Sequence, residues 1–401
     1  MSNLSSLRSE KLPSTWNLPA IGEVLLDSQY GTNEPVTEGG NTRIVGMKDI
    51  QEGKVIVDKL TSSNLPGEER KKFLLKKGDL LINRTNSYDL VGKVGIFESD
   101  EEVAFASYLV RLVVDESKIS AKFLNYWLNC EMAQVMIKRI ATRAISQANI
   151  NPTEFKRHCL VPLPPLPEQT AITNLLSTMD QAIKKTERLI AAKEKKYLWL
   201  LSNLISNNKH KRRHIRNFTS EVSRRNTGTE IARVLSVTNN RGFVLPEDQF
   251  ERRVASSDLS NYKIVVRGQY AYNPSRINVG SIARLDEWDN GVLSPMYVVF
   301  EVNKQKVNSD YFLHWLESHE AKERIRNSAQ GSVRETVSFA DLGTIPFPLP
   351  SLDKQNVIAS VLNTALQEIN LLKKQLEVYR KQKRGLMQKL LTGQWRVRTE
   401  D

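Results

Sequence analysis

Residues 162–204 decide the fold, and they read PLPPLPEQTAITNLLSTMDQAIKKTERLIAAKEKKYLWLLSNL. Proline fixes the φ angle and favours an extended chain, so the opening of this stretch predicts a stiff spacer. After it, apolar residues recur in alternating steps of four and three, the pattern of one seam of a coiled coil. The pattern predicts a long amphipathic helix. Its seam positions are Ile172, Leu176, Met179, Ile183, Thr186, Ile190, Lys193, Tyr197, Leu200 and Leu204, with Thr186 and Lys193 as interruptions.

A second seam of the same length lies 186 positions further along the chain, and only Lys383 interrupts it. The two helices could pair with each other, pack into separate cores or pair with another chain. Connectivity favours an antiparallel pair within the chain, because a parallel pair would force the second globular domain to bridge the whole length of the helices. The positions of the second seam are Ile358, Leu362, Ala365, Ile369, Leu372, Leu376, Tyr379, Lys383, Leu386 and Leu390.

The repetition extends beyond the helices, and internal repeats of this kind define the architecture. The offset between the copies drifts from 190 to 186 along the chain without a jump, which small loop insertions explain. We infer that one design, a globular domain followed by a long helix, is written twice. The matching pairs are Gly78 with Gly268, Val91 with Val279, Trp127 with Trp315, Pro162 with Pro348 and Gln169 with Gln355.

Each copy opens with short stretches that are rich in β-branched and aromatic residues, which predict strands. They are residues 55–57, 80–82 and 108–114 in the first copy, and 262–266 and 296–300 in the second. A helix is predicted next, near residues 121–140 and 310–328, with Ser120 and Ser309 as N-caps.

The predicted fold class is therefore α+β, with two β-rich domains in tandem, each followed by a long helix, and with pseudo-two-fold symmetry. The predicted segments are a first domain at 1–165, a first helix at 166–207, a second domain at 208–350, and a second helix with the C-terminal tail at 351–396.

Composition points to a polyanionic partner. The 401 residues carry a formal net charge of +13, from 58 Lys and Arg against 45 Asp and Glu. Nucleic acid is the first reading, an acidic membrane surface the second and solubility alone the third. No apolar run approaches the roughly 20 residues of a membrane span. We expect a cytoplasmic protein without a signal peptide, since the N-terminus lacks an apolar core and the chain has few thiols.

The sequence shows no catalytic or metal-binding motif. It has no phosphate-cradling GxxxxGK[ST] loop and no GxGxxG after a strand. Asn273-Pro274 opens like the loop of amino-methyltransferases, but Ser275 breaks that pattern. Cys130 and Cys159 form no CxxC pair, and His158 beside Cys159 is a poor ligand pair, so a structural zinc site is not expected. We expect a chain without enzymatic activity of its own.

Polar loops between the repeated residues are the candidate DNA-reading elements, because they differ between the copies where the surrounding residues agree. Arg, Asn, Gln, Ser and Thr are the side chains that reach base edges and phosphates. The basic run at 209–216 is either a solvated linker or a further phosphate contact. The candidate DNA-binding residues are Arg84, Thr85, Asn86, Ser87, Tyr88, Lys93, Arg143, Gln147, Arg276, Asn278, Gln330 and Arg334.

The chain resembles the specificity subunit of type I restriction–modification systems, over nearly its whole length. The second copy departs from the family pattern, because it starts at residues 215–218 without a counterpart of Trp16. The carriers of the resemblance are Lys77-Gly78-Asp79-Leu80-Leu81, Arg84-Thr85-Asn86, Val91-Gly92-Lys93-Val94-Gly95, Leu235-Ser236-Val237 with Arg241-Gly242, Pro162 to Gln169, and Leu390-Leu391-Thr392-Gly393.

The resemblance implies two target-recognition domains that read the halves of a bipartite, asymmetric site in double-stranded DNA, with the helices setting the spacer. It implies two DNA-methylation subunits and restriction (translocase) subunits as partners. S-adenosylmethionine, ATP and Mg²⁺ are expected on those partners, and no cofactor is expected on this chain. Alternatives are a specificity subunit of a methylation-only or other defence system, a diverged nuclease or methyltransferase, and a coiled-coil scaffold that reads no sequence.

Overall fold

The computed structural model describes residues 12–143, 147–206, 210–228, 230–246, 258–330 and 336–398. The chain divides into two compact units. Unit 1 comprises residues 1–186 and 375–401, and unit 2 comprises residues 187–374. Each unit contains one globular head and one half of each long helix, and each is described by itself below.

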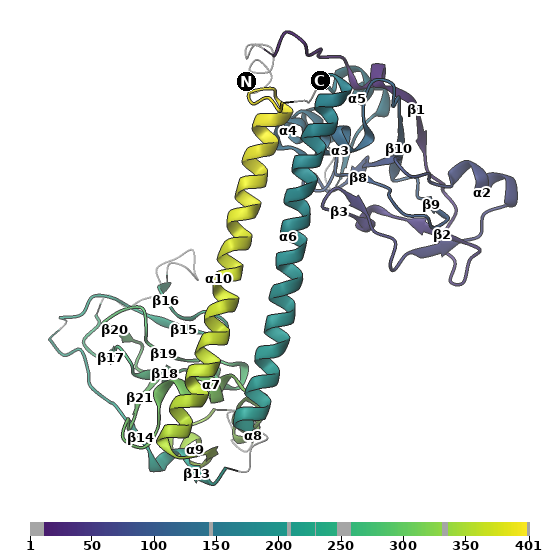
Figure 1. Ribbon diagram of the computed structural model, residues 1–401. Coiled ribbons are helices and arrows are strands. Elements are labelled where there is room, and N and C mark those ends of the chain that lie inside the picture. Colours follow the sequence, from purple (N-terminus) through teal and green to yellow (C-terminus); the bar gives the residue numbers. More distant parts are fainter. Residues whose placement is uncertain are drawn as a thin grey trace. The chain divides into compact units, whose positions relative to one another are not determined.

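The two predicted long helices are α6 (Leu166–Leu201), extended by a π-helical turn at Ser202–Ser206, and α10 (Leu352–Leu391) (Figure 1). Every predicted seam position is buried or half-buried. In unit 1, Ile172 near the start of α6 shares a core with Leu390 at the end of α10. In unit 2, Leu201 at the end of α6 shares a core with Ile358 near the start of α10. The expected antiparallel pair within the chain is confirmed.

The polar interruptions of the seams have partners. Lys193 Nζ lies 2.6 Å from Glu368 Oε1 in unit 2, and Lys383 Nζ lies 2.5 Å from Asp180 Oδ1 in unit 1. The Thr186 hydroxyl donates to the Ala182 carbonyl one turn earlier. A polar residue in a seam commonly fixes the register of the pair at some cost in stability.

The head of unit 1 is built on a sheet with the strand order β1-β10-β6-β8-β4-β3. Two smaller sheets have the orders β5-β2-β9 and β11-β12-β7. The elements are η1 (Ile21–Val24), β1 (Leu25–Tyr30), β2 (Thr42–Val45), η2 (Met47–Asp49), β3 (Ile50–Gln51), β4 (Lys54–Val55), β5 (Thr61–Ser63), α2 (Gly67–Phe73), β6 (Leu80–Asn83), β7 (Thr85–Asn86), β8 (Val94–Ile96), β9 (Val103–Phe105), β10 (Leu109–Val114), α3 (Ala121–Asn129), α4 (Glu131–Ile140), β11 (Thr142–Arg143), β12 (Ala148–Asn149) and α5 (Pro152–His158).

The head of unit 2 repeats four adjacent strands of that sheet, because the antiparallel order β14-β21-β18-β19 matches β1-β10-β6-β8. The duplication inferred from sequence offsets is thus present in the strand topology. The elements are β13 (Arg212–His214), η4 (Ile215–Asn217), β14 (Thr219–Glu221), β15 (Ser236–Thr238), β16 (Gly242–Val244), β17 (Lys263–Val266), β18 (Tyr270–Tyr272), η6 (Ile277–Val279), β19 (Ile282–Arg284), β20 (Asn290–Leu293), β21 (Val298–Val302), α7 (Ser309–Glu317), α8 (His319–Gln330), α9 (Phe339–Thr344) and β22 (Pro346–Pro348).

A glutamine at the start of each long helix makes the same three hydrogen bonds in both units. In unit 1, Gln169 Oε1 accepts from the Ser120 N–H at 2.8 Å, and Nε2 donates to the carbonyls of Lys118 and Pro164. In unit 2, Gln355 Oε1 accepts from the Asn308 N–H at 2.8 Å. Its Nε2 donates to the carbonyls of Lys306 and Pro350. Both side chains are fully buried, so each glutamine ties a head to its helix.

The second copy has a clear start in the structure, although it lacks a counterpart of Trp16. The Ile21 N–H donates to the Cys159 carbonyl in unit 1, and the Ile215 N–H donates to the Ile345 carbonyl in unit 2. Both isoleucines open a 3₁₀ turn that leads into the first strand of the shared sheet. Part of the basic run is therefore not a linker, since residues Arg212–His214 form strand β13 against β22.

Two details of the predicted head helices are wrong. The helix expected near 121–140 breaks at Cys130, and the one near 310–328 breaks at Ser318, where the backbone is extended. The N-cap of α7 is Asn308 instead of Ser309, because the Asn308 side chain accepts from the Tyr311 N–H at 3.0 Å. Ser120 is the N-cap residue of α3, but its side chain makes no capping hydrogen bond.

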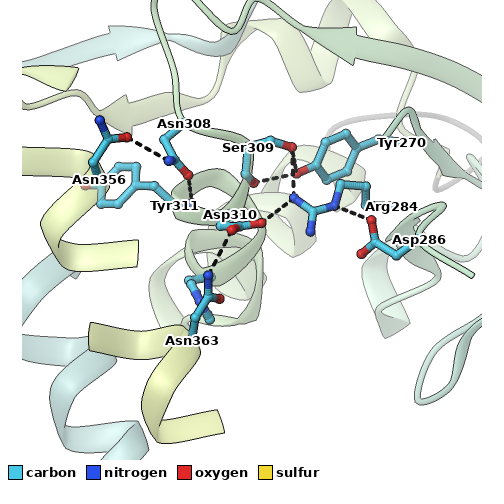
Figure 2. Close-up of polar contacts among 10 residues, drawn as sticks. Tyr270, Arg284, Asp286, Asn308, Ser309, Asp310, Tyr311, Asn356 and Asn363 are labelled. Carbon is cyan, nitrogen blue, oxygen red and sulfur yellow. Dashed lines mark hydrogen bonds and ion pairs between the residues drawn. The ribbon is translucent and has the colours of Figure 1, made fainter. Parts of the chain in front are cut away.

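A polar network fastens the head of unit 2 to α10 (Figure 2). Asp310, in the first turn of α7, accepts from Arg284 Nη1 at 2.7 Å and from Asn363 Nδ2 at 2.8 Å. Arg284 also donates to Asp286 at 2.7 Å. Burial works against the charge of Arg284, but these carboxylates raise its pKa on balance.

Within the described ranges, no group of His, Cys, Asp and Glu side chains could hold a metal ion, and His158 instead lies 3.2 Å from Glu154. Both cysteines are free and buried. Of the helices in the described residues, none is long and apolar enough to cross a membrane.

Candidate nucleic-acid interface

The small sheet β11-β12-β7 brings together candidate residues that are far apart in the sequence. Thr85 pairs with Asn149, and Asn86 pairs with Ala148. Arg143 pairs with Ala148 from the other side. Residues 84–88 therefore share one surface with Arg143 and the exposed Gln147, which directly precedes β12.

Arg84 is held inside this surface by the chain itself. Its Nε donates to the Ser107 carbonyl at 3.1 Å, and its Nη1 donates to Asn149 Oδ1 at 3.2 Å. The guanidinium also lies over the ring of Tyr30, 4.9 Å from its centroid. Arg84 is half-buried, so it positions the surface as well as contributing a positive charge to it.

Two cationic side chains from other elements lie over the ring of Tyr88. The Arg143 guanidinium lies 3.5 Å from the centroid of its ring, and Lys138 Nζ of α4 lies 5.5 Å from the same point. Such cation–π contacts hold an arginine side chain in place while its remaining donors stay free for a ligand. Arg143 is exposed, so its donors are accessible.

A cavity of about 710 Å³ opens beside this surface, in the same head. Asn86 and Lys93, both candidates from the sequence, line it together with Lys48 and Tyr108. Lys48, Lys93 and Tyr108 are exposed and form its rim. The sequence did not predict four further residues of this surface, because only long-range contacts bring them beside the loop at 84–93. These residues are Tyr30, Lys48, Tyr108 and Lys138.

The head of unit 2 places its candidates at the matching position, in the turn between β18 and β19. Arg276 is exposed there and stands 188 positions after Tyr88. Asn278 lies in η6, which packs against α8. Asn278 lines a cavity of about 420 Å³ together with the exposed Lys322 and Arg326 of α8.

Of the remaining candidates, two have side chains that the structure does not describe and two are exposed. Arg334 lies outside the described residues, and for Gln330 only the backbone, at the end of α8, is described. Ser87 and Lys93 are exposed. Arg324 of α8, which is not a candidate, donates from Nε to Glu320 at 2.8 Å. The structure thus gathers the described candidates into one surface in each head.

Comparisons with known proteins agree with this organisation. Residues 13–194 and 270–378 match the family model described as the type I restriction modification DNA specificity domain. The chain is 25% identical over 423 aligned residues to a Methanocaldococcus jannaschii protein named putative type I restriction enzyme MjaX specificity subunit, with 99% of this chain and 97% of that one covered. Over 171 residues it is 28% identical to the type I restriction enzyme StySPI specificity subunit of Salmonella potsdam, which covers 42% of this chain and 37% of that one.

A solved structure shares the fold. The crystal structure of the S subunit of a type I restriction–modification system from M. genitalium aligns with a TM-score of 0.59. The alignment covers 95% of this chain and 98% of that one at 18% sequence identity. The likeness extends over both heads and both long helices, and at that identity it shows the fold alone.

Proposed function

This chain belongs to the family of type I restriction modification DNA specificity domains, and from that premise we propose that its two heads read the two halves of a bipartite, asymmetric DNA site. Specificity subunits of type I systems recognise DNA and leave catalysis to partner subunits, and this chain is one of them. We assign the first recognition domain to residues 1–165 and the second to 208–350, with central helices at 166–207 and 351–396.

One observation carries the proposal: the two heads share a frame and differ in the loops it holds. The frame includes the repeated strand order and the glutamine clamps, by which we mean the buried Gln169 and Gln355. Each glutamine makes the same three hydrogen bonds in its own head. The loop after β6 presents Thr85, Asn86 and Ser87, whereas the loop after β18 presents Arg276 and Asn278 at the corresponding place. Different polar side chains on equivalent loops would read different bases.

The proposed contacts fall into two classes. Exposed Arg143, Gln147 and Arg276 have donors for base edges or phosphates, as do Asn86 and Asn278 at the cavities. Lys93 and the exposed lysines of the rims suit phosphates, which supply affinity without sequence information. Arg276→Ala is expected to weaken specific binding by about 1–3 kcal/mol if it contacts guanine bidentately. An equal loss on random DNA would indicate a phosphate contact.

Arg84→Ala serves as the contrasting variant. Because Arg84 bonds to Ser107 and Asn149, its loss is expected to lower the stability of the first head as well as DNA binding. Arg276 is exposed, and its loss is expected to affect DNA binding alone. Thermal unfolding of both variants, measured beside DNA binding, separates these outcomes.

We further propose that two DNA-methylation subunits dock on the central helices, and that restriction (translocase) subunits complete the assembly. Trp199 of α6 is 61% exposed and Val357 of α10 is 64% exposed, which leaves apolar side chains for a partner helix. S-adenosylmethionine, ATP and Mg²⁺ would bind to these partners. Trp199→Ala should weaken capture of the methylation subunit without changing the DNA sequence preference.

The helices would set the spacer between the half-sites. Lys193 and Glu368 face each other across the pair, so a heptad inserted after each keeps both seams in register. Seven residues lengthen a helix by about 10 Å, which corresponds to about three base pairs of DNA. Sequencing of methylated adenines would then report a longer spacer, whereas an unchanged spacer would refute this part of the proposal.

The function as a whole is tested by sequencing methylated adenines in the host with and without this gene. The proposal predicts that one bipartite motif loses its methylation when the gene is absent. Unchanged methylation would contradict it. Purified chain with DNA, Mg²⁺ and S-adenosylmethionine should neither cut nor methylate, and methylation by the chain alone would favour the enzyme alternative.

A further inference from the structure

The cavity in the first head has a floor that differs from its rim. Thr32, Ser63 and Asn83 line it and are buried. Cavities that hold small organic ligands usually measure about 300–1,000 Å³, and this one, at about 710 Å³, lies within that range. Its size therefore suits a planar ring with substituents better than a single ion or water.

The floor carries polar groups without partners. Asn83 is 1% exposed, and neither its amide oxygen nor its amide nitrogen has a hydrogen-bond partner among the residues that the structure describes. The buried Ser63 hydroxyl is in the same situation. Buried polar side chains nearly always have a partner, and an exception calls for an explanation. A ligand with a hydrogen-bonding edge that enters the cavity supplies one when these two side chains turn toward it.

The other lining residues narrow the chemistry of that ligand. Ile44, Ile50 and Met47 give the cavity apolar walls. Lys48 and Lys93 stand on the rim and are exposed. This lining matches a flat aromatic base that is attached to a phosphodiester. The apolar walls suit the faces of the base, the carboxamide suits its hydrogen-bonding edge, and the lysines suit the phosphate. A carboxamide offers one acceptor beside one donor, which pairs with the edge of a base.

We propose, building on the proposed function, that this cavity receives one unstacked base of the bound DNA and that Asn83 reads its edge. Extrusion of a base costs its stacking and pairing energy, and hydrogen bonds and apolar contacts in the pocket offset that cost. The base then contributes to sequence reading from inside the protein, beside the loop at residues 84–93.

The second head does not repeat this arrangement. Asn273, which stands 190 positions after Asn83, has a partner for each end of its amide. Its Oδ1 accepts from the Ser275 N–H at 3.0 Å, and its Nδ2 lies 3.8 Å from the Met296 sulfur. Base extrusion is therefore assigned to the first half-site only.

A mismatch scan tests the inference on the purified full chain, so that no partner subunit can extrude a base. The DNA duplexes contain the bipartite motif that the sequencing of methylated adenines identifies. In each duplex, one base of the first half-site is mismatched by altering its pairing partner on the opposite strand. At a position that is extruded, a mismatch lowers the cost of opening, so we expect binding to tighten by about tenfold. At stacked positions, a mismatch should leave binding unchanged or weaken it.

Asn83→Leu is the decisive variant, because leucine is of similar size and needs no hydrogen bond. It should abolish the tightening and weaken binding to the matched first half-site by about 5- to 150-fold. Its melting temperature should be unchanged or higher, since no internal hydrogen bond of Asn83 is lost. Asn273→Leu is the matched control and should keep the tightening at the first half-site.

The outcomes separate the two proposals. Sequence-specific binding without any tightening position overturns the pocket and leaves the proposed function standing. Binding without sequence preference overturns the proposed function. A nucleoside monophosphate that binds the chain in the absence of DNA and is lost in Asn83→Leu, without a tightening position in DNA, identifies a free nucleotide as the ligand and overturns the extruded base.

Discussion

The two heads are fastened to the central helices at matching positions by different chemistry. In unit 1, the Tyr126 hydroxyl of α3 donates to Asp180 at 2.6 Å, and Asp180 pairs with Lys383 of α10. In unit 2, His314 of α7 takes the place of Tyr126. Its Nδ1 lies 2.9 Å from the Tyr197 hydroxyl of α6, and its Nε2 lies 2.7 Å from Asn363 Oδ1 of α10.

The comparison shows which parts of the repeat are interchangeable. Lys383 and Tyr197 occupy equivalent seam positions. Tyr197 meets His314 of its head directly, whereas Lys383 is linked to Tyr126 of its head through Asp180 of α6. One joint contains an ion pair and the other is neutral. The location of the polar joint is thus common to both copies, which fits a role in fixing register, and its chemistry is free to differ. The glutamine clamps differ in neither respect.

The glutamine clamp should give the largest effect. Gln169→Ala leaves the Ser120 N–H and two carbonyls without their partner and should lower the free energy of unfolding of the first head by about 3 kcal/mol. Gln355→Ala should do the same to the second head. Hydrogen exchange of α3 and α7 measures each effect. Exposed Thr170→Ala is the control, and equal exchange in both heads of either variant would contradict the equivalence of the clamps.

Glu168 marks the strongest difference between the copies. Its buried carboxylate accepts from Trp16 Nε1 at 2.9 Å and from Arg396 Nε at 2.5 Å, which joins the start of the first head to the C-terminal tail within unit 1. Its counterpart in the repeat is the exposed Lys354. Glu168→Ala should cost about 2 kcal/mol by loss of these charge-assisted bonds, while Lys354→Ala stays within about 0.5 kcal/mol in urea denaturation.

The neutral joint predicts a pH dependence confined to unit 2. Burial lowers the pKa of His314 below 6.5, against the raising influence of Asn363, Asp310 and Glu317, while Arg284 lowers it further. The unfolded chain then binds more protons between the folded pKa and 6.5. Stability therefore falls as the pH drops below 6.5, by up to about 1.4 kcal/mol per pH unit.

Chemical denaturation of the wild type and His314→Gln across that window measures the effect, followed by hydrogen exchange in α7. The variant should lose the pH dependence of α7. Tyr126 offers the internal comparison, because burial and Asp180 raise its pKa and keep it neutral throughout. An equal dependence in α3 and α7 would assign the effect to other groups.

The smallest effect belongs to the seam ion pair of Lys193 and Glu368. Both side chains are partly exposed, so Lys193→Ala should change the free energy of unfolding by only about 0.2–1 kcal/mol. The double variant with Glu368→Ala gives the coupling energy of the pair. A coupling well above that range would mean that this pair, rather than the apolar seam, decides the pairing of the helices.

The periodic features of this molecule could be predicted from its sequence, because they depend on neighbours along the chain. The seams from Ile172 and Ile358 are buried or half-buried as their spacing required, and the duplication appears in strand order and hydrogen bonds. The breaks at Cys130 and Ser318 could not be foreseen, since neither residue is Pro or Gly and tertiary packing sets the bend.

The sequence could predict which loops contain the candidate site, but not how those loops come together. Thr85 and Asn149 pair in one small sheet although 64 residues separate them, and nothing local in the sequence announces that pairing. The orphaned amide of Asn83 is also a property of its surroundings. Its repeat partner Asn273 has the same residue type, and its amide has partners in Ser275 and Met296.

The central claim is that the two heads share a frame and that each recognises its own half of the DNA site. The most direct test is to determine the methylated motif that a variant chain specifies. Thr85, Asn86 and Ser87 are replaced by alanine in one strain, and Arg276 and Asn278 in another, with methylated adenines sequenced in both. We predict that each variant relaxes one half of the bipartite motif and keeps the other half and the spacer. Relaxation of both halves together, or of neither, would contradict the account.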